Sequence, residues 1–188
     1  MEKHTLWPTT VIRVNLADKE DIDLDQLAQE IILNYGHADN THKELDDHGF
    51  MVQGLVNLRE KYITPLVKKY LSEEFRVDLD HYDLTVYSFP VSITGDMEHH
   101  YHPKSTITTI FYPLDATAML VLLDPRGASC RGYPAEMMRD YFGSMRITPV
   151  AGDLWIIPSF LAHQVRCGKE EMRLSFVSDY HIEVKGVQ

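Results

Sequence analysis

The sequence predicts a mainly β protein, a sandwich or jelly roll, with N-terminal helices packed on one outer sheet face. From Tyr82 onward, short runs of residues alternate between apolar and polar with a period of two, which is typical of strands. Pro and Gly separate these runs, and such punctuation favours short antiparallel strands over a parallel sheet. Ahead of Tyr82 the apolar residues follow a helical spacing instead.

A chain of 188 residues is long enough to form one domain with its own core. No internal repeat, low-complexity tract or linker divides the sequence. We therefore expect a single domain over residues 1–188. Residues 1–81 would supply one strand and helical support, and residues 82–182 would form the β core.

The first part of the chain predicts one strand and two helices. The strand is expected at residues 10–16. A helix is expected at residues 21–35, where one apolar stripe is formed by Leu24, Leu27, Ala28, Ile31 and Ile32 and Gly36 follows as a stop signal. A second helix is expected at residues 54–71, and Pro65 either kinks it or begins a new helix.

The β core predicts seven strands, at residues 83–89, 106–112, 118–123, 144–150, 154–158, 163–167 and 173–180. A long excursion, residues 124–143, separates two of them and carries Arg126. Such an excursion beside a site often acts as a lid over the substrate. A structural insertion with a short helix at residues 135–142 is the equal alternative.

Composition and charge restrict the classes of partner. The formal net charge is −10, and duplex nucleic acid is not expected as a partner because phosphate binding needs clustered Lys and Arg. No apolar run approaches the ~20 residues that span a bilayer, so no membrane association is expected. Two cysteines need no disulfide in a domain of this size, which favours a reducing, cytoplasmic location. Assembly as a homodimer stays open.

Histidine is the unusual residue, with ten in the chain. In the segment His100-Tyr101-His102, strand geometry would place both imidazoles on one face, because side chains two apart point the same way. Two converging imidazoles form half of a metal site, and this ligand suits iron, zinc, copper and nickel. Two exposed histidines at a strand end are the alternative.

A third histidine and an arginine follow further along the chain. His163 lies just past a turn and opens a predicted strand. Arg173 and Ser175 share one face of the next strand, and a buried guanidinium there needs an anionic partner. Its planar fork suits a carboxylate, which could belong to a bound dicarboxylate or to the protein itself. Three imidazoles would leave positions on a metal open for a keto acid and dioxygen.

The sequence resembles the 2-oxoglutarate/Fe(II) oxygenase superfamily, and within it a little-characterised branch of oxygenases from bacteria and phages. The resemblance is carried by an H-x-H-P…H…R-x-S pattern and by segments at residues 100–105, 110–112, 123–126, 148–154, 157–165 and 173–176. It implies a double-stranded β-helix, a cupin-like jelly roll. It also implies Fe(II) held by His100, His102 and His163, with 2-oxoglutarate and O2 as co-substrates.

The resemblance assigns the remaining site residues as well. Arg173 would hold the distal carboxylate of 2-oxoglutarate with help from Ser175, and Tyr87 and Tyr112 would line the co-substrate pocket. One position departs from the superfamily, which usually has a carboxylate where this chain has His102. Asp96 or Glu98 could take the place of His102 as a ligand, and His99 could take the place of His100.

The expected activity is hydroxylation of a small molecule or an amino-acid side chain, with release of succinate and carbon dioxide. One alternative is a three-histidine cupin-type metalloenzyme, either a dioxygenase or a zinc hydrolase, that does not use 2-oxoglutarate. Another is a non-catalytic binding module. The pair Arg173 and Ser175 favours the 2-oxoglutarate-dependent hydroxylase over the cupin-type metalloenzyme, because a cupin-type site has no need to hold a dicarboxylate.

Overall fold

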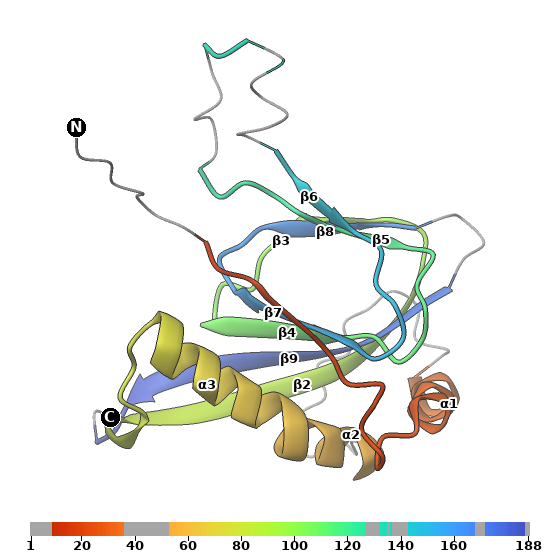
Figure 1. The fold of residues 1–188 in the computed structure, drawn as a ribbon, viewed down its shortest axis with the longest axis horizontal. Helices are drawn as coiled ribbons and strands as arrows, with labels where there is room; N and C mark the ends of the chain where they lie inside the picture. Colours follow the sequence, from red (N-terminus) through yellow and green to blue (C-terminus); the bar gives the residue numbers. More distant parts are fainter. Residues whose placement is uncertain are drawn as a thin grey trace.

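Two antiparallel sheets face each other in the computed structural model (Figure 1), which describes residues 9–35, 53–126, 132–134, 136, 143–167 and 172–186. The larger sheet has the strand order β1 (Ile12–Asn15), β7 (Asp153–Pro158), β4 (Ile107–Phe111), β9 (Met172–Val184), β2 (Tyr82–Thr94). The smaller sheet has the order β3 (Met97–His100), β8 (His163–Arg166), β5 (Met119–Leu122), β6 (Met145–Ile147). The prediction of a mainly β chain with antiparallel sheets is confirmed.

The longest strand pair joins β2 to β9 over their full lengths, from Tyr82 opposite Val184 to Thr94 opposite Met172. Both strands are longer than the sequence pattern predicts. Pro90 interrupts the pattern in β2, but β2 is an edge strand, and an edge tolerates a residue that cannot donate to a neighbour. The short strand β3 was not predicted, because Met97-Glu-His-His shows no apolar alternation.

Helices cover the outer face of the larger sheet (Figure 1). They are α1 (Leu24–Tyr35), α2 (Gln53–Leu58), the π-helix η1 (Arg59–Ile63), α3 (Thr64–Glu74) and the short 3₁₀ helix η2 (Leu79–His81). Pro65 lies in the first turn of α3, and the helical backbone continues through Ile63 and Thr64 without a break. The wider π turn before Pro65 accommodates its missing N–H. Within the described ranges, no helix has both the length and the apolar character that a membrane span requires.

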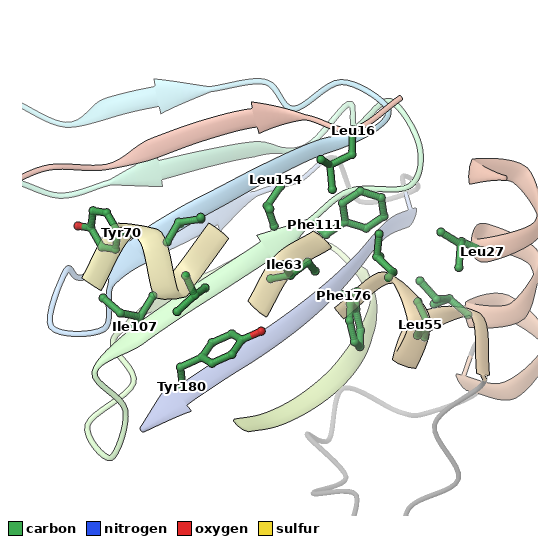
Figure 2. Close-up of a cluster of buried hydrophobic side chains, with 14 of the residues drawn as sticks. Leu16, Leu27, Leu55, Ile63, Tyr70, Ile107, Phe111, Leu154, Phe176 and Tyr180 are labelled. Carbon is green, nitrogen blue, oxygen red and sulfur yellow. The ribbon is translucent and has the colours of Figure 1, made fainter. Parts of the chain in front are cut away.

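Two hydrophobic clusters flank the larger sheet. The outer one lies between helices and sheet, where Leu55, Ile63 and Tyr70 face Phe111 and Phe176 (Figure 2). The inner one fills the space between the two sheets and includes Ile110, Leu120, Trp155, Ile157, Val165 and Val177. Strands β4 and β7 are therefore buried on both faces, which explains their uninterrupted apolar runs.

Strand β1 is fastened to β7 by a buried carboxylate and a close backbone contact. Asp153 is fully buried, and it accepts hydrogen bonds from Arg13 and Asn15 at 3.0 Å each. The backbone N–H of Leu16 donates to the carbonyl of Gly152 at 2.8 Å. Gly152 has a φ of +82°, and a Cβ added there would lie 2.7 Å from the backbone nitrogen of Ala17. Only glycine therefore fits at this junction.

Candidate metal site between the sheets

Three histidines, His100, His102 and His163, converge at one end of the space between the sheets. One ring nitrogen of each lies within 4.8 Å of the other two, and the ring centroids are 4.4 to 5.4 Å apart. Across the described part of the chain, no other group of three or more His, Cys, Asp or Glu side chains meets in this way. The donor set of three imidazoles suits a divalent transition metal.

Two different local structures bring the histidines together. His100 ends β3 and lies opposite His163, the first residue of β8. His102 lies two residues past the end of β3, and its ring meets that of His100 as expected. Its backbone N–H donates to the carbonyl of Ser159 at 3.0 Å. The segment after β3 is thus held against the turn between β7 and β8.

Each imidazole makes a hydrogen bond from its Nδ1 to an oxygen that can only accept. The acceptors are the Glu98 carbonyl for His100 at 2.9 Å, the Asp179 carboxylate for His102 at 2.8 Å, and the Leu161 carbonyl for His163 at 3.0 Å. Nδ1 therefore carries the proton in all three rings. The remaining nitrogen, Nε2, is left with a lone pair for a metal.

Burial keeps His163 in the form that binds a metal. Loss of hydration lowers the pKa of His163 to about 4, against a smaller opposing effect of its bond to Leu161. The nearby imidazoles and Arg173 lower this pKa further. The ring is neutral at physiological pH as a result, and coordination costs no deprotonation.

Arg173 and Ser175 face the histidines from β9, and both line the same cavity. Arg173 is 5% exposed and Ser175 is fully buried. Neither the Arg173 Nε nor the Ser175 hydroxyl has a hydrogen-bond partner, and Arg173 makes no ion pair with any described residue. Buried polar atoms are rarely left without a partner, so these two donors are available to a bound group.

The two tyrosines of the expected site lie in different surroundings. Tyr112 is fully buried beside Arg173; burial raises its pKa, and the charge and hydrogen bonding of the Arg173 guanidinium oppose that rise. Tyr87 is 37% exposed and lies opposite Asp179 in the β2–β9 pair, six residues along β9 from Arg173. Its ring is 5.9 Å from that of Phe89, which lines the cavity. The roles of both tyrosines remain predictions.

The substitute ligands considered from the sequence lie elsewhere. Asp96 accepts hydrogen bonds from Arg166 at 2.7 Å and from the Cys167 backbone at 2.9 Å. Glu98 and His99 are exposed and do not belong to the histidine group. Most of the 124–143 excursion lies outside the described residues; at its start, Arg126 pairs with Asp124 at 2.5 Å.

Sequence reasoning missed three polar residues beside the histidines: Asp179, Thr108 and Ser159. Thr108 and Ser159 are buried, and Asp179 is largely so. Asp179 has the same strand parity as Arg173 and Ser175, so alternation along β9 places it on the cavity face. The sequence could have indicated Asp179, because it is a carboxylate on the same predicted strand face as Arg173 and Ser175.

No protein-family model matches the chain, and no curated protein is similar to it in sequence. Its fold is nevertheless similar to that of several solved structures. One is the epimerase SnoN in complex with Fe3+, alpha-ketoglutarate and nogalamycin RO, with 12% identity, a TM-score of 0.61, and coverage of 95% of this chain and 83% of that one.

Two further similar structures are hydroxylases. A Pseudomonas putida prolyl-4-hydroxylase has 13% identity, a TM-score of 0.55 and 92% coverage of both chains. A Trichoplax adhaerens prolyl hydroxylase, in complex with a hypoxia inducible factor peptide fragment, has 12% identity, a TM-score of 0.60, and coverage of 91% of this chain and 83% of that one. At these identities the likeness is one of fold, and it confirms the expected double-stranded β-helix.

Proposed function

We propose that this chain is an Fe(II)- and 2-oxoglutarate-dependent dioxygenase that hydroxylates a small molecule or an amino-acid side chain. The observation that carries the proposal is the pair Arg173 and Ser175, because the buried Nε of Arg173 and the buried hydroxyl of Ser175 lack hydrogen-bond partners in the cavity that the three histidines line. A metal site alone does not need a buried arginine and serine with free donors. A metal site that also binds a dicarboxylate needs such donors for the carboxylate that is far from the metal.

The histidines fit the metal that this function needs. His100, His102 and His163 would hold Fe(II), each through Nε2, since each Nδ1 is occupied by a protein acceptor. Iron with 2-oxoglutarate and dioxygen supplies an oxidant for an unactivated C–H bond, and succinate and carbon dioxide are released. Among the similar folds, SnoN was solved with Fe3+ and alpha-ketoglutarate, which supports this cofactor set.

Arg173 and Ser175 would bind the distal carboxylate of 2-oxoglutarate. A guanidinium can donate two parallel hydrogen bonds to a carboxylate, and the Ser175 hydroxyl can donate a third. The cavity between the sheets is narrow, about 20 Å³, which is room for about one water. The keto acid is larger than this space, so lining side chains would have to move to admit it; Phe89 and Met97 are two half-buried members of the lining.

The rest of the lining is largely apolar. Val91, Leu120 and Val165 line the cavity together with the histidines and would limit the water in it. A dry cavity strengthens the attraction between Arg173 and a bound carboxylate, because the dielectric constant around them is low. The substrate class is consistent with the similar folds, of which one holds a small molecule and another a peptide fragment.

The test is anaerobic addition of Fe(II) and 2-oxoglutarate to metal-free protein. A visible charge-transfer absorption band is expected for the unaltered protein. It should be lost in Arg173→Ala and His102→Ala and kept in Arg146→Ala, which removes an exposed arginine on β6. Tight Fe(II) binding with no band at any 2-oxoglutarate concentration would contradict the proposal and favour a three-histidine site that does without the keto acid.

A further inference from the structure

We infer that Asp179 is a positioning residue for the metal centre, which orients His102 and supplies a negative charge that the three neutral ligands lack. The inference rests on the proposed function, because it assumes that the three histidines hold a divalent metal. Asp179 does not itself join the histidine group. Its carboxylate acts through the imidazole that stands between it and the cavity.

Both oxygens of the Asp179 carboxylate are engaged. Oδ2 accepts a hydrogen bond from Nδ1 of His102 at 2.8 Å, and Oδ1 accepts one from the Thr108 hydroxyl at 2.7 Å. The side chains of His102 and Asp179 are only 12% and 13% exposed, so water competes little for these bonds. A carboxylate held at both oxygens cannot rotate, and it fixes the plane of the ring that it contacts.

The hydrogen bonds form a closed circuit around His102. Thr108 donates its proton to Asp179, so its oxygen accepts from the Ser159 hydroxyl at 2.9 Å. Ser159 in turn accepts, through its backbone carbonyl, the N–H of His102 at 3.0 Å. His102 is thus held at its backbone and at its ring by one connected set of groups. Thr108 and Ser159 are buried, at 0% and 1% exposure.

The three histidines differ in the charge of the group behind them. His100 and His163 donate to backbone carbonyls, which are neutral, whereas His102 donates to a carboxylate. His102 also stands at the position where the sequence resemblance expects a carboxylate ligand. This chain therefore keeps an anion on that side of the metal and moves it one hydrogen bond further away. A carboxylate behind an imidazole raises the basicity of the ligand and fixes its tautomer.

Metal binding alone tests the inference, without 2-oxoglutarate or turnover. Metal-free protein is titrated with Co(II) or Zn(II) against a competing chelator, and the Co(II) absorption spectrum is recorded. Asp179→Asn removes the charge, and its amide oxygen can still accept the bond from Nδ1, so the ring orientation is kept. We expect Asp179→Asn to bind either metal about 10-fold to 100-fold more weakly than the unaltered protein, and Asp179→Ala to bind at least as weakly.

Asp153→Asn is the matched control, because Asp153 is also a buried carboxylate but bonds Arg13 and Asn15 on β1, away from the histidines. Asp153→Asn should lower the melting temperature and leave the metal affinity of the folded protein unchanged. Thr108→Val keeps Asp179 and removes one of its donors, so a smaller loss of affinity, a few-fold, is expected. This variant also keeps the inference testable if Asp179→Asn does not fold.

Equal metal affinity in Asp179→Asn and the unaltered protein would overturn the inference, and so would a loss of the same size in Asp153→Asn. The proposed function fails separately. Suppose that Asp179→Asn binds the metal weakly but that 2-oxoglutarate binding does not depend on Arg173. The role of Asp179 would then stand, and the proposed dioxygenase function would be rejected. An unaltered protein that takes up no metal would overturn both.

Discussion

His100 and His163 lie directly opposite each other on the antiparallel strands β3 and β8, with ring centroids 4.4 Å apart. Side chains opposite each other on neighbouring strands have their Cβ atoms about 4.5–5.5 Å apart, so two imidazoles in these positions can meet. The register of β3 against β8 shifts between Met97 and His100, which sets this pairing. The smaller sheet thus supplies two of the three proposed ligands as a cross-strand pair. His102 would complete the site from the segment that follows.

The cross-strand pair predicts a strict dependence of metal binding on His163. His163→Ala should lower the affinity for Co(II) by more than the roughly 10–100-fold that loss of a group behind a ligand costs, because it removes a ligand itself. Chelator competition measures the change. His81→Ala is the control, since His81 is an exposed histidine that pairs with Asp78. Equal losses in the two variants would contradict the assignment.

Ser175 is predicted to matter for the co-substrate and not for folding. Ser175→Ala removes a buried hydroxyl without a partner, so the melting temperature should stay the same or rise slightly. A hydrogen bond to a carboxylate contributes about 1.5–3 kcal/mol, so the Kd for 2-oxoglutarate should rise about tenfold or more. Isothermal titration with Fe(II) present measures it.

Ser178→Ala provides the contrast on the same strand. Ser178 is buried on the opposite face of β9, and its hydroxyl accepts a hydrogen bond from Ser88 at 2.8 Å. This variant should lose about 1 kcal/mol of stability and keep its affinity for 2-oxoglutarate. The reverse pattern in the two serine variants would show that Ser175 serves the fold.

Two buried tyrosines predict a loss of stability at high pH. Burial raises the pKa of Tyr70 and of Tyr180 to about 12, whereas a tyrosine in the unfolded chain has a pKa near ~10. The folded state therefore holds these protons more tightly, and their contribution is complete below pH ~10 and is lost as the pH rises towards about 12. Urea denaturation at several pH values should show this decline. The decline should be shallower in Tyr70→Phe and Tyr180→Phe, and identical slopes would contradict the prediction.

Gly152 is predicted to be required by the close contact with β1. Gly152 and Gly95 both have a φ of +82°, so an alanine costs about 1–2 kcal/mol at either position. At Gly95 nothing lies within 4 Å of the added Cβ, whereas at Gly152 the backbone of Ala17 lies in the way. Gly152→Ala should lower the free energy of unfolding more than Gly95→Ala does. Equal losses would mean that the backbone conformation alone sets the cost.

Much of the site could be predicted from the sequence because its parts lie on regular strands. The expected face shared by Arg173 and Ser175 follows from strand alternation alone, and the position of His163 at the start of β8 follows from the turn before it. The convergence of His102 with His100 was also expected. The contact that fixes the backbone of His102, its N–H bond to Ser159 fifty-seven residues along the chain, is encoded by no local pattern.

Asp179 shows the same limit more clearly. Its bond to His102 spans 77 residues of sequence, and its bond to Thr108 spans 71. Alternation can place such a carboxylate on the cavity face, but the register between β9 and β4 decides which side chains it meets. Register depends on packing of the whole sheet, so these contacts could be found only in three dimensions.

Pro90 has a consequence for assembly. Strand β2 forms one border of the larger sheet, and a long row of unpaired backbone groups at such a border invites the sheet of another molecule to continue across it. A proline in the middle of that row has no backbone N–H to donate, so it interrupts the row of hydrogen bonds that an added strand would need. The opposite border, β1, is only four residues long. Both borders of the larger sheet therefore resist extension by the sheet of another molecule.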